Sequence, residues 1–239
     1  MWTFKRTVCL SSLLSSFLGC GSEGSTEPPP NGEETQVVLQ SDRDNTLYED
    51  SAGALSNGTG QFIFAGVTNQ PRIRRATLRF DVSGSAIPAG ATVDSAKLTL
   101  HMSRTVAGPA TVTLHRLTGD WGEGGSDAPG AEGDGAPSEA GDATWIHNSF
   151  DTRPWSTNGG DFVSTASAST VVQSTGFYRW ESNAVMVSDI RDWLDDPANN
   201  FGWIVIGDES MPLTTKRFDS REHVVIEQRP SLTVFFTRP

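Results

Sequence analysis

The feature that most constrains the fold of this chain is a strict alternation of apolar and polar residues in two runs. Apolar side chains occupy every second position from 76 to 82 and again from 98 to 102. A period of two predicts a strand with one face in a core and the other in water. The connection between the runs, SGSAIPAGATVDS, is rich in turn-forming residues. We therefore expect 75–104 to form the central antiparallel pair of a β-sandwich.

Shorter runs of the same kind recur along the chain. Strands are predicted at 36–40, 61–65, 110–117, 144–146, 162–164, 171–173, 177–180, 202–207, 217–219, 224–227 and 232–236. All-β domains of this size are often single, and 24 glycines and 13 prolines suit many strands joined by turns. The expected fold class is an all-β antiparallel β-sandwich of the jelly-roll or galactose-binding-like kind, forming a single domain over 37–239.

Two segments depart from the strand pattern. One short helix is predicted over 183–195, because apolar residues recur there at helical spacing; Ser188 can cap it, and Pro197 ends it. Residues 118–143 form a long acidic, Gly-rich stretch without any period. Loops of this length inside a compact domain are usually either functional or disordered.

The N-terminal segment 1–20 has the pattern of a signal peptide. A basic start and a short apolar stretch lead to Phe17-Leu18-Gly19-Cys20. This ending resembles the lipobox of bacterial lipoproteins, which implies lipidation at Cys20 and a place at the outer membrane or cell surface. Leucine is usual where Phe17 stands, so cleavage without lipid, giving a secreted protein, is the alternative. Residues 21–36 contain few apolar side chains and are expected to form a disordered tether.

Charge and cysteine content narrow the class of partner. The net charge is −11, and two of the cations, Lys5 and Arg6, lie in the predicted signal peptide. A chain this acidic lacks the cationic footprint that nucleic acid or an anionic membrane surface requires. Both cysteines, Cys9 and Cys20, precede the predicted domain, so no disulfide is expected in it.

Seven stretches, taken together, resemble one protein family. They are RRATLRFDVSGSAIPAGATVDSAKLTLHM, GDWGEG, DATW, TRPWSTNGGDF, VSDIRDWLDDPANNFGWIVIGDE, KRFDSRE and RPSLTVFF, and they cover nearly all of 37–239. In this order they resemble the DNRLRE domain family of bacterial and archaeal surface proteins. The resemblance implies a β-sandwich of a kind often appended to polysaccharide-degrading enzymes. Some similar domains are classed as carbohydrate-binding modules for alginate-type polysaccharide.

The residues give little support for catalysis. The sequence contains no GxSxG elbow, no HExxH and no P-loop. His101 and His115 project outward from strands expected to be neighbours, where the imidazoles could meet or simply be solvated. The acids of 118–143 lack a fixed partner that would tune one carboxyl against another, as glycoside hydrolysis requires. A polysaccharide lyase or hydrolase is therefore the least favoured hypothesis.

Tryptophans near the irregular stretch suggest a sugar-binding platform. Trp121, Trp145 and Trp155 are flanked by Asp, Asn and Gly, and sugars stack their flat C–H faces on aromatic rings. The alternative is that these rings pack the long loops onto the edge of the sandwich. Trp193 and Trp203 lie in apolar periodic runs and are expected in the core.

Cationic side chains suggest a second site on a sheet face. The residues that could converge there are Arg75, Arg79, Lys97, His101 and His115. Such a face would suit a carboxylated or sulfated glycan, which arginine grips bidentately. The alternative is cross-strand pairing with acids such as Asp81.

The motif KRFDSRE at 216–222 alternates charges densely along an extended run. Such alternation is usually an internal salt-bridge ladder, but the family resemblance covers this motif. We therefore keep Arg217, Arg221 and Glu222 as carbohydrate-binding candidates.

A structural calcium ion is the one cofactor that the composition suggests. Hard cations prefer several oxygen ligands, which acidic Gly-rich loops supply. Asp120, Glu123 and Asp142 are the candidate ligands, and Asp42 with Asp44 is an alternative pair. The spacing matches neither an EF-hand nor the nine-residue repeat of β-helix proteins.

The leading hypothesis is a non-catalytic, surface-tethered module that binds polysaccharide, in particular an anionic one. The alternative is a structural or protein-interaction domain of the cell envelope without a glycan ligand.

Overall fold

The computed structural model describes residue 32 and residues 34–85 and 87–239. The predicted signal peptide, the lipidation site Cys20 and most of the predicted tether lie outside the described residues. Within the described part, no helix is both long and apolar enough to cross a membrane.

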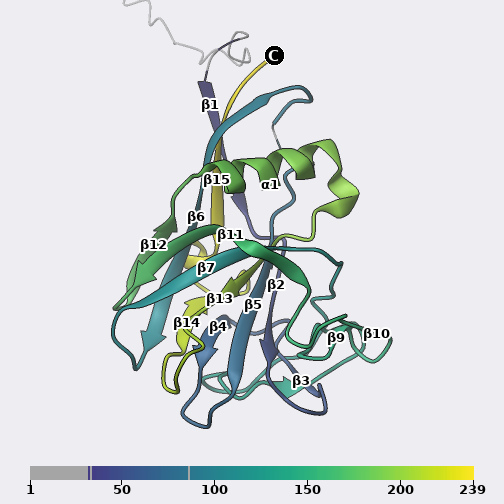
Figure 1. The fold of residues 1–239 in the computed structure, drawn as a ribbon, viewed down its shortest axis with the longest axis vertical. Coiled ribbons are helices and arrows are strands. Elements are labelled where there is room, and N and C mark those ends of the chain that lie inside the picture. The colour runs from purple at the N-terminus through teal and green to yellow at the C-terminus, as the bar shows by residue number, and fades with distance from the viewer. Residues whose placement is uncertain (1–31, 33, 86) are drawn as a thin grey trace, which may run out of the picture.

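The domain is an antiparallel β-sandwich, as predicted, whose two layers form one curled sheet (Figure 1). The first layer contains β1 (Glu34–Gln40), β15 (Ser231–Thr237), β6 (Thr92–Thr105), β12 (Gly176–Trp180) and β14 (Lys216–Asp219). The second layer contains β2 (Arg43–Tyr48), β5 (Ile73–Arg79), β13 (Trp203–Ile206), β7 (Ala110–Leu117) and β11 (Phe162–Val172). The strand β4 (Phe62–Val67) pairs with β14 and with β5, and so joins the two layers.

The core lies between the layers and is built by the alternation seen in the sequence. Along β6, the even-numbered residues from Ala96 to Met102 are buried and the intervening ones are partly exposed. Trp193 and Trp203 pack edge to face in this core, with ring centroids 4.6 Å apart. Their predicted core positions are confirmed.

The prediction that 75–104 forms a central antiparallel pair is wrong. β5 pairs with β2, β4 and β13, whereas β6 pairs with β12, β14 and β15. The connection between them crosses from one layer to the other, and its apolar residues Phe80, Val82 and Ile87 are buried in the core. Alternation shows which face of a strand is buried, but it does not identify the neighbouring strand.

The helix α1 (Ala184–Asp195) confirms the predicted helix, with a different cap. The Asn183 side chain accepts hydrogen bonds from the backbone N–H groups of Val185 and Met186, so the cap is Asn183 and not Ser188. The helix contacts β6 and β11 and closes one end of the sandwich (Figure 1).

Three local predictions also need correction. Residues 144–146 are irregular rather than a strand, and the short strand that follows them covers His147–Ser149. Residues 43–48 form the buried strand β2, although their polar sequence gave no strand signal. The predicted strand 224–227 is instead an exposed segment with a short 3-10 helix at Ile226–Gln228.

The long acidic stretch 118–143 is packed against the sandwich and carries little regular structure. Short pairs tie down this region: β3 (Leu55–Ser56) with β8 (Ala136–Pro137), and β9 (His147–Ser149) with β10 (Arg153–Pro154). A second 3-10 turn, Pro197–Asn199, follows α1.

Candidate functional site

A groove of about 640 Å³ opens where β4, β6 and β14 approach the 68–74 and 131–134 segments. Four arginines line it, namely Arg72, Arg74, Arg104 and Arg217, together with a single acid, Asp134. Apolar side chains complete the lining, and two of them, Val106 and Leu213, are largely exposed. The groove is therefore a local excess of positive charge in an acidic protein.

The two arginines on neighbouring strands have few partners. Arg217 on β14 lies directly opposite Arg104 on β6. Its Nε donates to the Ser103 hydroxyl at 3.1 Å, and its guanidinium lies 3.6 Å from the centre of the Phe62 ring. Burial and then the charge of Arg104 lower the pKa of Arg217. Within the described chain, neither arginine forms a salt bridge.

The other two arginines of the groove are already engaged. Arg74 is buried, donates to the carbonyl oxygens of Gly133 and Ile73, and lies over the Tyr48 ring. Arg72 is half exposed, and its guanidinium lies 3.9 Å from the Asp50 carboxylate. Arg104 and Arg217 are therefore the cations best placed to receive an anionic ligand.

The three candidate tryptophans do not form an exposed platform, which corrects that prediction. Trp121, Trp145 and Trp155 are at most 9% exposed and belong to a second apolar cluster under the long loops. Trp121 donates its indole N–H to the Phe201 carbonyl at 2.8 Å, and Trp155 donates to the Thr144 carbonyl at 2.9 Å. These rings hold the loops on the edge of the sandwich, which is the alternative raised above.

The predicted cationic face is also divided. His101 lies on β6 in the first layer, whereas Arg75, Arg79 and His115 lie on β5 and β7 in the second. Arg75 forms a two-pronged pair with Glu209, and Arg79 forms one with Asp42. The alternative of pairing with acids is therefore the one observed, with Glu209 and Asp42 as the partners in place of Asp81.

The two histidines make separate contacts. His101 Nδ1 lies 2.6 Å from the buried Asp219 carboxylate. The His115 ring contacts the Val163 carbonyl and the Thr113 hydroxyl. Because β6 and β7 are not paired, the two imidazoles do not share a site.

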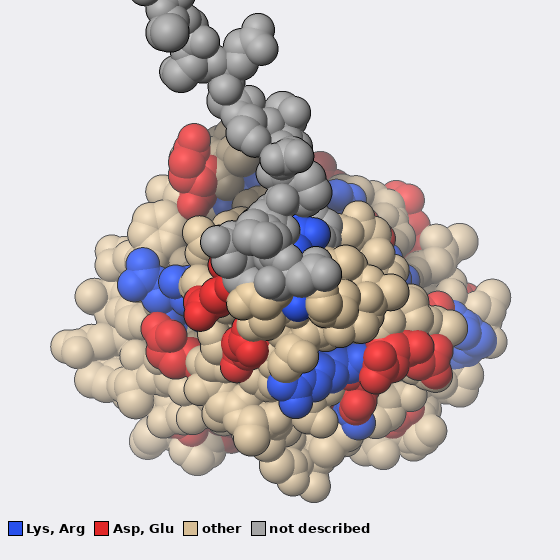
Figure 2. Space-filling model, turned by 90° about the horizontal axis from the view of Figure 1, so that it is seen from above, with Lys and Arg blue, Asp and Glu red and all other residues tan. Residues whose placement is uncertain are grey.

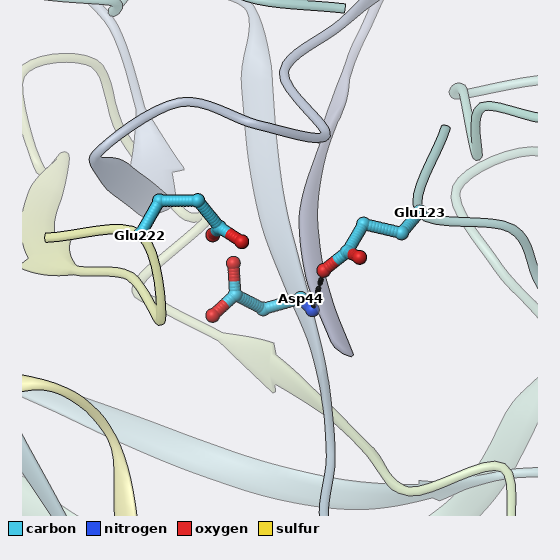
Figure 3. A group of neighbouring side chains, drawn as sticks. All are labelled: Asp44, Glu123 and Glu222. Atoms are coloured by element: carbon cyan, nitrogen blue, oxygen red, sulfur yellow. Dashed lines mark hydrogen bonds between the residues drawn. The ribbon is translucent and has the colours of Figure 1, made fainter. Parts of the chain in front are cut away.

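Glu222 belongs to an acidic cluster with Asp44 and Glu123 (Figure 3). One carboxylate oxygen from each of the three acids lies within 4.8 Å of the others. Arg221 binds Glu123 through two hydrogen bonds of 2.7 and 2.9 Å and approaches Glu222 at 2.8 Å. Figure 3 shows the carboxylates of Asp44 and Glu222 facing each other.

This cluster holds more negative charge than its one arginine balances. Burial and the neighbouring Glu222 raise the pKa of Asp44 well above its usual range. Burial is also the main cause that raises the pKa of Glu222 from 4.5 to about 7. Among the residues that the structure describes, one buried oxygen of Glu222, Oε2, has no hydrogen-bond partner. Near neutral pH a proton is therefore retained between these two carboxyls.

Stability should consequently fall as the pH rises through this range. Because the pKa of Glu222 is higher in the folded state than in the unfolded state, binding of its proton stabilises the fold. This stabilisation is complete below pH 4.5 and is lost as the pH rises through 7. Between pH 5 and pH 8, the free energy of unfolding of the wild-type chain should fall by on the order of 1 kcal/mol. A Glu222→Gln variant should not show this fall. Urea unfolding of both proteins at the two pH values measures the difference. Parallel pH profiles would show that Glu222 titrates normally.

The predicted calcium ligands are only partly brought together. Glu123 lies in the acidic cluster with Asp44, whereas Asp120 pairs with Arg43 and Arg153. Asp142 lies outside this cluster; it is fully buried and accepts hydrogen bonds from the backbone N–H groups of Ser126 and Glu139 in its own loop. The three oxygens of the cluster suit a hard cation, but Arg221 already binds two of the acids, Glu123 and Glu222.

Sequence reasoning missed Arg104, the groove partner of Arg217. The signal available was its position two residues beyond the last alternating apolar residue, Met102, close to the end of a long strand. Nothing in the sequence placed β14 beside that end of β6, so the convergence of the two arginines could not be foreseen.

The positive charge of the groove contrasts with the mixed charge on another face of the molecule. On the face seen in Figure 2, Lys and Arg side chains lie interspersed with Asp and Glu, without a large field of either sign. Within the described residues, seven arginines form salt bridges with acids: Arg43, Arg72, Arg75, Arg79, Arg116, Arg153 and Arg221. Arg104 and Arg217 therefore differ from most other arginines of the described part of the chain in forming no salt bridge.

Comparison of the chain with protein-family models finds no match, and comparison with curated proteins finds none either.

Proposed function

We propose that this protein is a non-catalytic polysaccharide-binding module, tethered at the cell surface, whose ligand is an anionic glycan. The observation that carries the proposal is the pair of arginines at the groove, Arg104 and Arg217, which lie opposite one another and, among the described residues, form no salt bridge. Like charges directly opposite on neighbouring strands repel. A carboxylate or sulfate group between them would relieve that repulsion and accept bidentate hydrogen bonds from either guanidinium.

The surroundings of the pair suit a sugar acid. Apolar side chains of the groove, Val106 and Leu213, can cover the C–H face of a pyranose ring. Polar side chains that also line the groove, including Asn69 and Gln70, can reach hydroxyls. The same proposal includes three features that the sequence suggests: a domain like those of the DNRLRE family, export directed by 1–20, and a lipid anchor at Cys20.

Affinity electrophoresis of the full chain tests the proposal. Gels contain alginate, pectin, heparin or a neutral glycan, with and without chelator, because a structural calcium stays a prediction. We expect at least one anionic polymer to retard the protein, and the neutral glycan to leave its mobility unchanged. Added salt should weaken the retardation, since the binding is electrostatic.

Replacement of both arginines gives the matched test. Each charge-assisted pair is worth about 1.5–3 kcal/mol, so Arg104→Ala with Arg217→Ala should weaken binding by a factor on the order of a hundred or more. Arg153→Ala, which removes an exposed arginine on β10, should change nothing. If none of the polymers changed the mobility of the wild-type protein, the result would instead favour a structural or protein-interaction domain of the envelope.

A further inference from the structure

The outer face of the first layer continues the groove along β6. Because Leu98, Leu100 and Met102 point into the core, the intervening residues Thr99, His101 and Ser103 point outward. Ser103 accepts the hydrogen bond from Arg217, so this face begins at the arginine pair. It then runs from there toward the 97–99 part of the strand.

An exposed aromatic ring lies on this face. Phe177 on β12 is directly opposite His101 on β6, and the two ring centroids are 4.7 Å apart. Phe177 is 55% exposed. His101 is held from the other side by Asp219 at 2.6 Å, so the histidine supports the phenylalanine from a fixed position. Aromatic rings displayed in this way are what pyranose rings stack on.

A further cation follows the ring. Arg179 lies opposite Thr99 on the same outward face and is exposed. In the part of the chain that the structure describes, it forms no salt bridge. The acid on this stretch, Asp219, is buried and bonded to His101, and the exposed Glu181 comes only after β12 has ended.

From these contacts we propose that the groove and this face form one extended track that binds an internal stretch of an anionic polysaccharide chain. The inference rests on the proposed function and adds the mode of recognition. Arg104 and Arg217 bind one acidic sugar, Phe177 stacks on a following ring, and Arg179 binds a further acidic group. Thr99 and Arg104 are separated by about 17 Å along the strand at roughly 3.3 Å per residue, which is longer than a single sugar unit.

Dependence on ligand length tests the track. Isothermal titration of the full chain uses alginate and oligogalacturonate fragments of two and of eight sugar units as probes. For whichever of the two polymers binds, the fragment of eight units should bind at least tenfold more tightly than the fragment of two units. Phe177→Ala should weaken octamer binding about three- to tenfold, the range for one aromatic contact, and leave dimer binding unchanged.

Control variants separate the two proposals. Val171→Ala, an equally exposed apolar residue on β11 of the other layer, should bind the octamer as the wild type does. Phe177→Trp should keep the affinity and report the octamer through a change in tryptophan fluorescence. Equal affinity for dimer and octamer, or normal octamer binding by Phe177→Ala, would overturn the track while the arginine groove stands. No binding of any acidic fragment would overturn both.

Discussion

Replacing Trp121 by alanine is expected to destabilise the domain by about 3–5 kcal/mol, as for other large buried aromatic residues. The ring is fully buried, and the Arg43 guanidinium lies 4.6 Å from its centre. Its indole N–H also satisfies the Phe201 carbonyl at 2.8 Å, which would lose its partner. Urea unfolding followed by circular dichroism gives the change in the free energy of unfolding.

The same variant separates packing from ligand binding. Trp121→Phe should recover part of the lost stability, because it refills most of the cavity without restoring the hydrogen bond. Below the unfolding transition, Trp121→Ala should still be retarded by the anionic polymer, since the ring lies outside the arginine groove. If Trp121→Ala kept normal stability but no longer bound the polymer, the result would favour the exposed tryptophan platform predicted from the sequence.

The strands could be predicted because burial on one face leaves a period of two in the sequence. β7 (Ala110–Leu117) was predicted with its observed bounds, and α1 was predicted to within one residue. β2 escaped because its buried residues include Asp44, Asn45 and Thr46, whose polar groups are satisfied by other segments rather than by water. The alternation of apolar and polar residues does not reveal such a strand, because its buried residues are polar.

The candidate site was less predictable, because it depends on which strands become neighbours. Arg217 was selected from its own motif, but its partner Arg104 lies 113 positions away and meets it only through the pairing of β14 with β6. Tryptophan beside Gly and Asp occurs both in exposed sugar sites and under packed loops. Local sequence therefore could not tell whether Trp145 would be exposed or buried.

Glu132→Ala should cost about 3 kcal/mol and loosen the long acidic segment 118–143. The buried Glu132 carboxylate accepts three hydrogen bonds, from the backbone N–H groups of Gln61 and Phe62 and from the Asn57 amide, at 2.8–3.1 Å. Removal of the acceptor leaves these donors unpaired, and charge-assisted bonds are among the stronger ones in proteins. Urea unfolding gives the stability, and limited proteolysis reports the opening of 118–143.

The neighbouring residues connect this loop to the groove. The Gly133 carbonyl holds the Arg74 guanidinium at 3.2 Å, and Gly133 and Asp134 form part of the groove wall. Loosening the segment should therefore also weaken binding of the anionic polymer, although Glu132 itself does not line the groove. Glu139→Ala removes an exposed acid from the same loop and should change stability by no more than about 0.5 kcal/mol. If Glu132→Ala behaved like Glu139→Ala in both measurements, the three hydrogen bonds would not be what holds this loop against the sandwich.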